Sequence, residues 1–311
     1  MRPVVGQRED EPAVVAHRTA RVDGLSVFYR EAGDPASPKL LLLGGFPASS
    51  HQFRNLIPAL ADRFHVVSPD YPGFGNTDMP DGFEYTFARL SEIVEGLLDE
   101  MDFHPFGLYM HDYGGPIGNR IVGRRPSWLE WQVIQNANAY EEGFTALWDG
   151  IRAVWRDRTP ETEAPLRSFL ELDGVKLLYL HGHRDPERIS PDNWNMDLHF
   201  LERPGARKAQ LDLLYDYRTN VERYPLWQLF LRERTPPTLI LWGENDIIFA
   251  PEGAQAYLRD LPEAELHMLG SGHFALEDSL EVIAAHIKRF HAERVLAADG
   301  GGAVELEGSA R

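Results

Sequence analysis

Short apolar runs alternate with stretches of helical periodicity along most of this chain. The apolar runs span four to six residues, and they suit strands that are buried on both faces of a sheet. They lie at 39–43, 64–68, 105–110, 131–134, 238–242 and 265–269. Helical stretches lie between them, at 51–61, 87–101, 116–124, 251–261 and 280–291. This alternation predicts an α/β fold with a mostly parallel central sheet and helices on both faces.

Two segments depart from the alternation. Near the N-terminus, residues 21–29 predict a β-hairpin that turns at Asp23-Gly24. Residues 140–232 are rich in Trp, Tyr, Leu and charge, and only 177–180 within them is compatible with a short strand. We interpret 140–232 as a mainly helical insertion into one core, formed by 17–139 and 233–295. Residues 1–16 and 296–311 are expected to be loose termini.

Composition narrows the classes of partner. The 311 residues can bury a large core, and 31 basic residues against 48 acidic ones give a net charge of −17. This charge argues against nucleic acid and anionic membranes, and it leaves a small-molecule partner and a homodimer open. The chain has no Cys, which excludes thiol nucleophiles and disulfides. A polar N-terminus and the lack of a long apolar run predict a cytoplasmic protein.

The segment around Asp112 carries the strongest chemical signal. The apolar run 105–110 is followed by His111-Asp112-Tyr113, then by two glycines and a helical stretch. A strand that turns sharply into a helix is the setting of a nucleophile elbow, where serine is the usual central residue. No Gly-x-Ser-x-Gly occurs in the chain, so the predicted nucleophile is the carboxylate of Asp112. Taken alone, Asp112 is equally compatible with a helix N-cap.

Two further polar residues follow predicted strands. Asp246 follows 238–242, and His273 follows 265–269. Because parallel strands end at one edge of a sheet, both are expected near Asp112, although turn and loop roles are the alternatives. The order nucleophile, acid, histidine is that of the α/β-hydrolase triad. The glycines before Phe46 allow close backbone approach, so the N–H groups of Phe46 and Tyr113 predict an oxyanion hole.

These motifs together resemble the epoxide hydrolase and haloalkane dehalogenase group of α/β-hydrolases. The resemblance rests on Gly45-Phe46-Pro47, Asp70-x-x-Gly73-x-Gly75, His111-Asp112-Tyr113-Gly114-Gly115, Trp242-Gly243-x-x-Asp246 and Gly272-His273-Phe274. It implies an α/β-hydrolase fold in which 140–232 is the cap domain over the site. It also implies that Asp112 forms an ester with the substrate, which His273, oriented by Asp246, then hydrolyses with water.

The cap contributes a candidate for epoxide opening. Residues 214–220 resemble the Trp-Tyr-Arg-Asn element of epoxide hydrolases, which implies that Tyr217 donates a hydrogen bond to the epoxide oxygen. Tyr215 competes for this role, and packing in the cap core is the alternative for Tyr217. A second such tyrosine is absent at the expected spacing. Tyr140 and Tyr179 are possible substitutes, but no motif surrounds them. The candidate substrate contacts are Tyr140, Tyr215, Trp148 and Trp155.

Three departures from the resemblance bear on the reaction. Tyr113 replaces the usual Trp, whose indole binds halide in dehalogenases, and Phe46 replaces an Asn that offers a second halide donor. Gly44 replaces the usual His. The loss of both halide donors favours hydrolysis of an epoxide to a diol over dehalogenation of a haloalkane or haloacid by the same Asp112. An esterase or lactonase, and a non-catalytic binding protein, are weaker alternatives.

No cofactor or metal is expected. The nearest signal for a metal is His181-Gly182-His183, which has no carboxylate partner in the sequence around it. The proposed reaction needs none, because a carboxylate with an ordinary pKa of about 4 is ionised at neutral pH without help.

Overall fold

The core of the molecule is an eight-stranded sheet. The computed structural model describes residues 13–297, so 1–12 and 298–311, which make up most of the expected loose termini, lie outside the described residues. The strand order is β1-β2-β4-β3-β5-β6-β7-β8; the pairs β1-β2 and β2-β4 are antiparallel, and the other five pairs are parallel. The strands are β1 (Ala16–Val22), β2 (Leu25–Ala32), β3 (Lys39–Leu43), β4 (His65–Pro69), β5 (Phe106–His111), β6 (Leu129–Gln135), β7 (Thr238–Gly243) and β8 (Glu265–Leu269).

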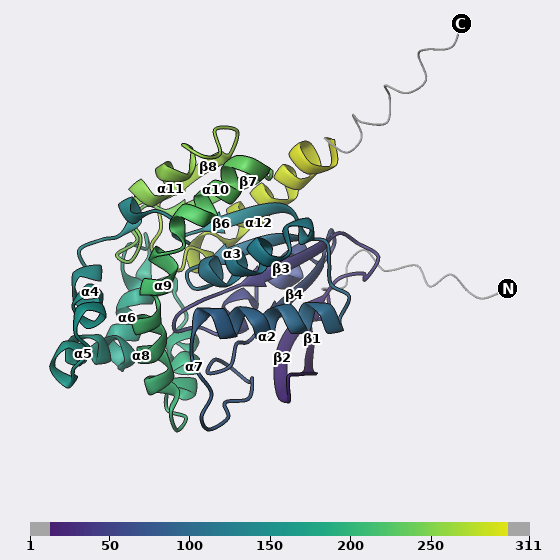
Figure 1. Ribbon diagram of the computed structural model, residues 1–311. Helices are drawn as coiled ribbons and strands as arrows, with labels where there is room; N and C mark the ends of the chain where they lie inside the picture. The colour runs from purple at the N-terminus through teal and green to yellow at the C-terminus, as the bar shows by residue number, and fades with distance from the viewer. Residues whose placement is uncertain (1–12, 298–311) are drawn as a thin grey trace, which may run out of the picture.

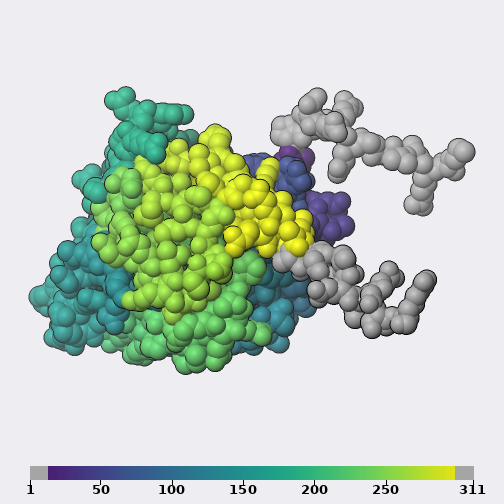
Figure 2. All heavy atoms as spheres, turned by 90° about the horizontal axis from the view of Figure 1, so that it is seen from above, coloured from purple at the N-terminus to yellow at the C-terminus, as the bar shows by residue number. Residues whose placement is uncertain are grey.

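Helices cover both faces of this sheet, as predicted (Figure 1). Alternate residues of β3 point to opposite faces, so Leu41 and Leu43 belong to one hydrophobic core and Leu40 and Leu42 to the other. The first core is closed by α2 (Phe87–Glu100), α3 (Gly114–Arg124) and α11 (Pro251–Tyr257), and the second by α1 (Leu56–Leu60) and α12 (Leu276–Phe290). Seen from above, the residues from about 250 onwards, drawn yellow-green to yellow, cover the middle of the face turned to the viewer (Figure 2).

The insertion between β6 and β7 is helical and lies at one end of the sheet (Figure 1). Residues 177–180 form the last turn of a helix, so the short strand considered for them is wrong. Val175, Leu178 and Tyr179 are buried at helical spacing, which places one face of this helix against the core. The helices are α4 (Trp148–Arg156), α5 (Pro160–Arg167), α6 (Leu172–Leu180), α7 (Asp192–Leu201), α8 (Ala206–Asp216), α9 (Arg218–Val221) and α10 (Tyr224–Arg234).

Three helix predictions needed correction. The stretch 251–261 is helical only as far as Tyr257, where α11 ends. The stretch 51–61 is divided into a short 3-10 helix, Ser50–Phe53, and α1. Pro58 lacks an N–H and is tolerated only near the start of a helix, so α1 begins two residues before it. Helix α12 begins at Leu276, earlier than predicted, and Ser279 interrupts it with non-helical angles. None of the helices within 13–297 has the length and apolar character to cross a membrane.

Candidate active site

Asp112 lies on a sharp turn between β5 and α3. Its φ of 50° is in the left-handed region, which a non-glycine residue occupies only where the surrounding structure imposes it. Two backbone hydrogen bonds fix the turn: Asp112 N–H donates to Asn136 O at 3.2 Å, and Gly115 N–H donates to Asp112 O at 3.0 Å. The predicted elbow is therefore present, with a carboxylate at its centre.

The structure brings Asp112, Asp246 and His273 together at the carboxyl ends of β5, β7 and β8. His273 Nδ1 lies 2.8 Å from Asp246 Oδ2, and His273 Nε2 lies 3.8 Å from Asp112 Oδ2. All three side chains are buried. The longer distance exceeds a hydrogen bond and suits a base that acts on a water beside Asp112.

Asn136 supports this triad and was not predicted from the sequence. Its side-chain NH₂ group donates to Asp246 Oδ2 at 2.8 Å, and its side-chain oxygen Oδ1 accepts Gly243 N–H at 2.9 Å. The second Asp246 oxygen accepts Ile248 N–H at 2.7 Å. Asn136 follows β6, at the same sheet edge as the triad, so the rule that located Asp246 and His273 could also have found it.

The two predicted oxyanion donors both bond the carboxylate of Asp112. Phe46 N–H donates to Asp112 Oδ1 at 2.6 Å, and the backbone N–H of Tyr113 also bonds this carboxylate. Gly45 makes the approach possible, because a Cβ there would lie 2.1 Å from Asp112 Oδ1 and 2.4 Å from Tyr113 N. The same two amides could stabilise the oxyanion that forms when an Asp112 ester is attacked.

Hydrogen bonds and side-chain packing hold the loop that carries Phe46. Gly44 O accepts the Tyr71 hydroxyl at 2.9 Å, and the buried Asp70 carboxylate accepts Ser50 N–H at 2.7 Å. The Gln52 side chain fills the space above Gly44, where a Cβ would lie 1.4 Å from its Nε2. Because Gly44 has no side chain, it leaves room for the side chain of Gln52.

Burial and neighbouring charges change the pKa values of Asp112 and His273. It raises the pKa of Asp112 to about 6, against the opposing effect of His273 and the two backbone amides. This corrects the ordinary value near 4 assumed from sequence, although a carboxyl group with pKa 6 is still mostly ionised at pH 7. Burial alone would lower the pKa of His273, but the charge and hydrogen bond of Asp246, helped by Asp112, raise it instead.

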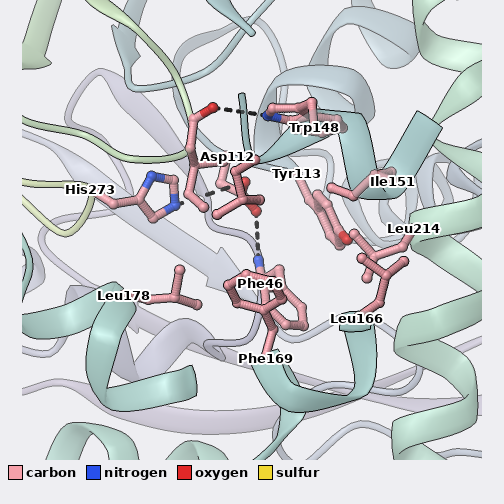
Figure 3. Close-up of a pocket in the computed structure, with 12 residues that line it drawn as sticks. Phe46, Asp112, Tyr113, Trp148, Ile151, Leu166, Phe169, Leu178, Leu214 and His273 are labelled. Carbon is pink, nitrogen blue, oxygen red and sulfur yellow. Dashed lines mark hydrogen bonds and ion pairs between the residues drawn. The ribbon is translucent and has the colours of Figure 1, made fainter. Parts of the chain in front are cut away.

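A small cavity opens beside Asp112 and His273 (Figure 3). The space available to the centres of water molecules is about 40 Å³, which is room for a few waters. Its walls are mostly apolar, and most come from the cap. The lining residues are Phe46, Asp112, Tyr113, Leu147, Trp148, Ile151, Leu166, Phe169, Leu178, Leu214, Ile248 and His273.

Tyr217 lies next to this cavity but is not one of the residues that line it. Its ring packs 4.6 Å from that of Trp148 and 6.1 Å from that of Tyr113. Its hydroxyl lies 3.3 Å from the hydroxyl of Tyr224, a residue that the sequence did not single out. The hydroxyl of Tyr217 is therefore paired with the hydroxyl of another tyrosine.

One of the four predicted substrate contacts lines the cavity, and three lie elsewhere. Trp148 lines it, with its indole N–H bound to Ile248 O at 2.8 Å. The others are not on the cavity wall, and their side chains have partners of their own. Trp155 N–H donates to Leu214 O, the Tyr140 hydroxyl donates to Asp260, and the Tyr215 ring packs against Arg218.

Tyr179 connects helix α6 to the loop that carries His273. Its ring stacks on Phe274 with centroids 4.1 Å apart and planes inclined by 11°. Its hydroxyl donates to Asp197 Oδ2 at 2.7 Å. Because Phe274 follows His273, the contact from α6 also restrains the base.

Two histidine groups bear on metal binding. His183 does have a carboxylate partner, Asp278 Oδ2 at 2.9 Å, which the sequence did not reveal because Asp278 belongs to α12. Within residues 13–297, one group has the residue types of a metal site: Glu265, His267 and His286, with ligand atoms within 4.8 Å. Glu265 already pairs with Arg289, and none of these residues lines the cavity.

The chain belongs to the alpha/beta hydrolase fold family, whose model matches residues 38–280. It is 39% identical over 281 residues to an uncharacterized hydrolase of Saccharomyces cerevisiae, covering 89% of this chain and 97% of that protein. It is 27% identical to a haloalkane dehalogenase of Bradyrhizobium diazoefficiens, covering 89% and 94%. It is also 25% identical to epoxide hydrolase 3 of Mus musculus, covering 81% and 70%.

Proposed function

We propose that this hydrolase opens a small, mostly apolar epoxide to a diol through an ester on Asp112. The observation that carries the proposal is a buried carboxylate at the nucleophile elbow, with His273 Nε2 3.8 Å from it. The likeness to an epoxide hydrolase supports the choice of substrate class.

In the first step, one oxygen of Asp112 attacks an epoxide carbon, and the carbon–oxygen bond of the ring breaks. Asp112 needs no base for this attack, because at pH 7 roughly nine in ten such groups with a pKa of about 6 are ionised. The apolar walls of the cavity accommodate the rest of the substrate. The ring oxygen leaves carbon with the electrons of the broken bond and takes up a proton from a donor in the site. The product of this step is therefore an ester that carries a neighbouring hydroxyl.

In the second step, His273 removes a proton from water, which attacks the carbonyl carbon of the Asp112 ester. The charge that develops on the carbonyl oxygen is stabilised by the N–H groups of Phe46 and Tyr113. Asp246 holds His273 through Nδ1 and stabilises its protonated form. The diol leaves, and the Asp112 carboxylate is restored.

The test is a panel of small epoxides and bromoalkanes assayed with the wild type, Asp112→Ala and His273→Ala. Asp112→Ala should lose all turnover. His273→Ala should stop after one equivalent, and intact-protein mass spectrometry should show the added mass of the substrate on the peptide that contains Asp112. A label on another residue, or steady turnover by either variant, would rule out the mechanism.

Haloalkane dehalogenation is the second candidate, because the likeness to a haloalkane dehalogenase extends over most of both chains and the first step is the same. Two features weaken it: the Trp148 indole N–H is bound to Ile248 O, and the Phe46 side chain offers no donor. Halide release without diol formation in the same panel would select this candidate over the epoxide reaction.

A further inference from the structure

The cavity contains one polar side-chain group without a partner. Besides Asp112, three of its lining residues carry polar side-chain atoms: Tyr113, Trp148 and His273. The indole N–H of Trp148 is bound to Ile248 O, and His273 is held by Asp246. The Tyr113 hydroxyl is buried and makes no hydrogen bond to any protein group within residues 13–297.

The ring of Tyr113 is held firmly in this position. Phe87 packs edge-on against it at 4.9 Å, and Phe46 and Phe74 contact it at 6.1 and 6.4 Å between centroids. The ring leads away from the carboxylate of Asp112, and its hydroxyl faces the apolar wall near Leu214 (Figure 3). The nucleophile and the residue that carries this hydroxyl therefore line the same cavity.

A buried hydroxyl without a partner loses its hydrogen bond to water and gains nothing in return, so a ligand acceptor placed there is favoured. Burial, and next the charge of Asp112, raise the pKa of Tyr113 well above its usual value. The group therefore stays protonated as a donor throughout the working range of the site. The apolar wall around it provides no competing acceptor.

From this placement we infer that Tyr113 is a catalytic residue that donates its phenolic proton to the epoxide oxygen during ring opening. The inference rests on the proposed epoxide reaction and changes the assignment of the donor. Tyr217, the donor implied by the sequence motif, shares its hydroxyl with Tyr224 and does not line the cavity.

The proposed step is balanced. Asp112 forms a bond to the epoxide carbon, the electrons of the broken carbon–oxygen bond move to oxygen, and that oxygen takes the proton of Tyr113. In the second step His273 gains a proton from water while the ester is hydrolysed. That proton returns to the Tyr113 phenolate, so the enzyme regains its initial state and the net reaction is epoxide plus water to diol.

The test compares two alkylating agents in a His273→Ala background, where the ester accumulates. An epoxide needs a proton as it opens, and a bromoalkane of similar shape does not. Adding Tyr113→Phe should slow epoxide alkylation of Asp112 by about 10²- to 10³-fold, as expected for loss of a general acid. It should slow bromoalkane alkylation by less than roughly tenfold, which also shows that the variant is folded.

Tyr217→Phe in the same background is the matched control and should leave epoxide alkylation within a few-fold of its parent. Unchanged epoxide alkylation in the Tyr113 variant, or a large loss confined to the Tyr217 variant, would overturn the inference. If the parent is alkylated by the bromoalkane and by no epoxide, the proposed function itself fails, and the donor role fails with it.

Discussion

The side-chain amide of Asn136 donates to Asp246 Oδ2 at 2.8 Å, and the same oxygen binds His273 Nδ1. Asn136 therefore fixes the rotation of the acid that orients the base. It does so from a backbone with φ of 42°, in the left-handed region that Asn tolerates better than most residues. One residue thus serves both the turn after β6 and the triad.

Replacing Asn136 should slow hydrolysis of the ester more than its formation. Asn136→Gly removes the amide and keeps the backbone relaxed, so ester hydrolysis should fall by about tenfold, the effect of one lost charge-assisted hydrogen bond. Asn136→Ala should in addition lose about 1 kcal/mol of stability because of its positive φ. Single-turnover kinetics and urea unfolding measure the two effects. Equal stability of Asn136→Gly and Asn136→Ala would show that the positive φ at this position does not strain an alanine.

The two chemical steps should respond differently to pH. Asp112 acts when ionised, so ester formation should decline as the pH falls through about 6. His273 acts when neutral, and Asp246 raises its pKa above the usual 6.5, so ester hydrolysis needs a higher pH than ester formation. The fraction of enzyme held as the ester should therefore be largest just above the pKa of Asp112, at about pH 6, and should fall as the pH rises further. Rapid quenching followed by mass spectrometry measures the fraction of enzyme present as the ester. This fraction would not change with pH if both steps depended on one shared pKa.

Gly45→Ala should abolish ester formation. A Cβ at this position would lie 2.1 Å from Asp112 Oδ1, so the carboxylate must leave the Phe46 and Tyr113 amides, and we expect a loss of about 100-fold or more. Gly123→Ala is the control, since no atom lies within 4 Å of its added Cβ. That variant, in α3, should gain roughly 0.5–1 kcal/mol from helix propensity. Retained alkylation in Gly45→Ala would show that the carboxylate has another productive position.

Asp197→Asn should stabilise the protein increasingly as the pH rises. Burial raises the pKa of Asp197 to about 7, from 3.8, so the folded state favours the protonated form. Ionisation of the unfolded state therefore lowers stability from about pH 4 upwards, until the folded carboxyl ionises near pH 7. The gain from Asn should grow by about 2–3 kcal/mol between pH 5 and 8. Urea unfolding at both values measures it, and a gain independent of pH would contradict the ionisation.

The sheet could be predicted from sequence because short, mostly apolar runs such as those of β3 and β7 alternate with helical stretches along the chain. The triad followed from the same prediction, since residues after parallel strands meet at one edge. Helix limits were less accurate around Pro58 and Ser279, where local geometry interrupts an apolar pattern that continues through it.

The cap site could not be predicted in this way. The motif singled out Tyr217, but only the packing of α8 to α10 shows that its hydroxyl meets Tyr224. Likewise, composition suggested that Trp155 and Tyr140 contact the substrate, yet their polar atoms find Leu214 and Asp260 far along the chain. Helix-to-helix packing decides which aromatic side chains face a cavity, and periodicity alone does not contain that information.

The stack of Tyr179 on Phe274 places a cap helix in contact with the loop that carries the base. An outward displacement of α6 would separate the two rings and remove this contact next to His273. The position of His273 then depends on a helix that contributes no reacting group. A substitution in α6 could therefore alter the interval between bond formation and release while leaving every reacting group in place.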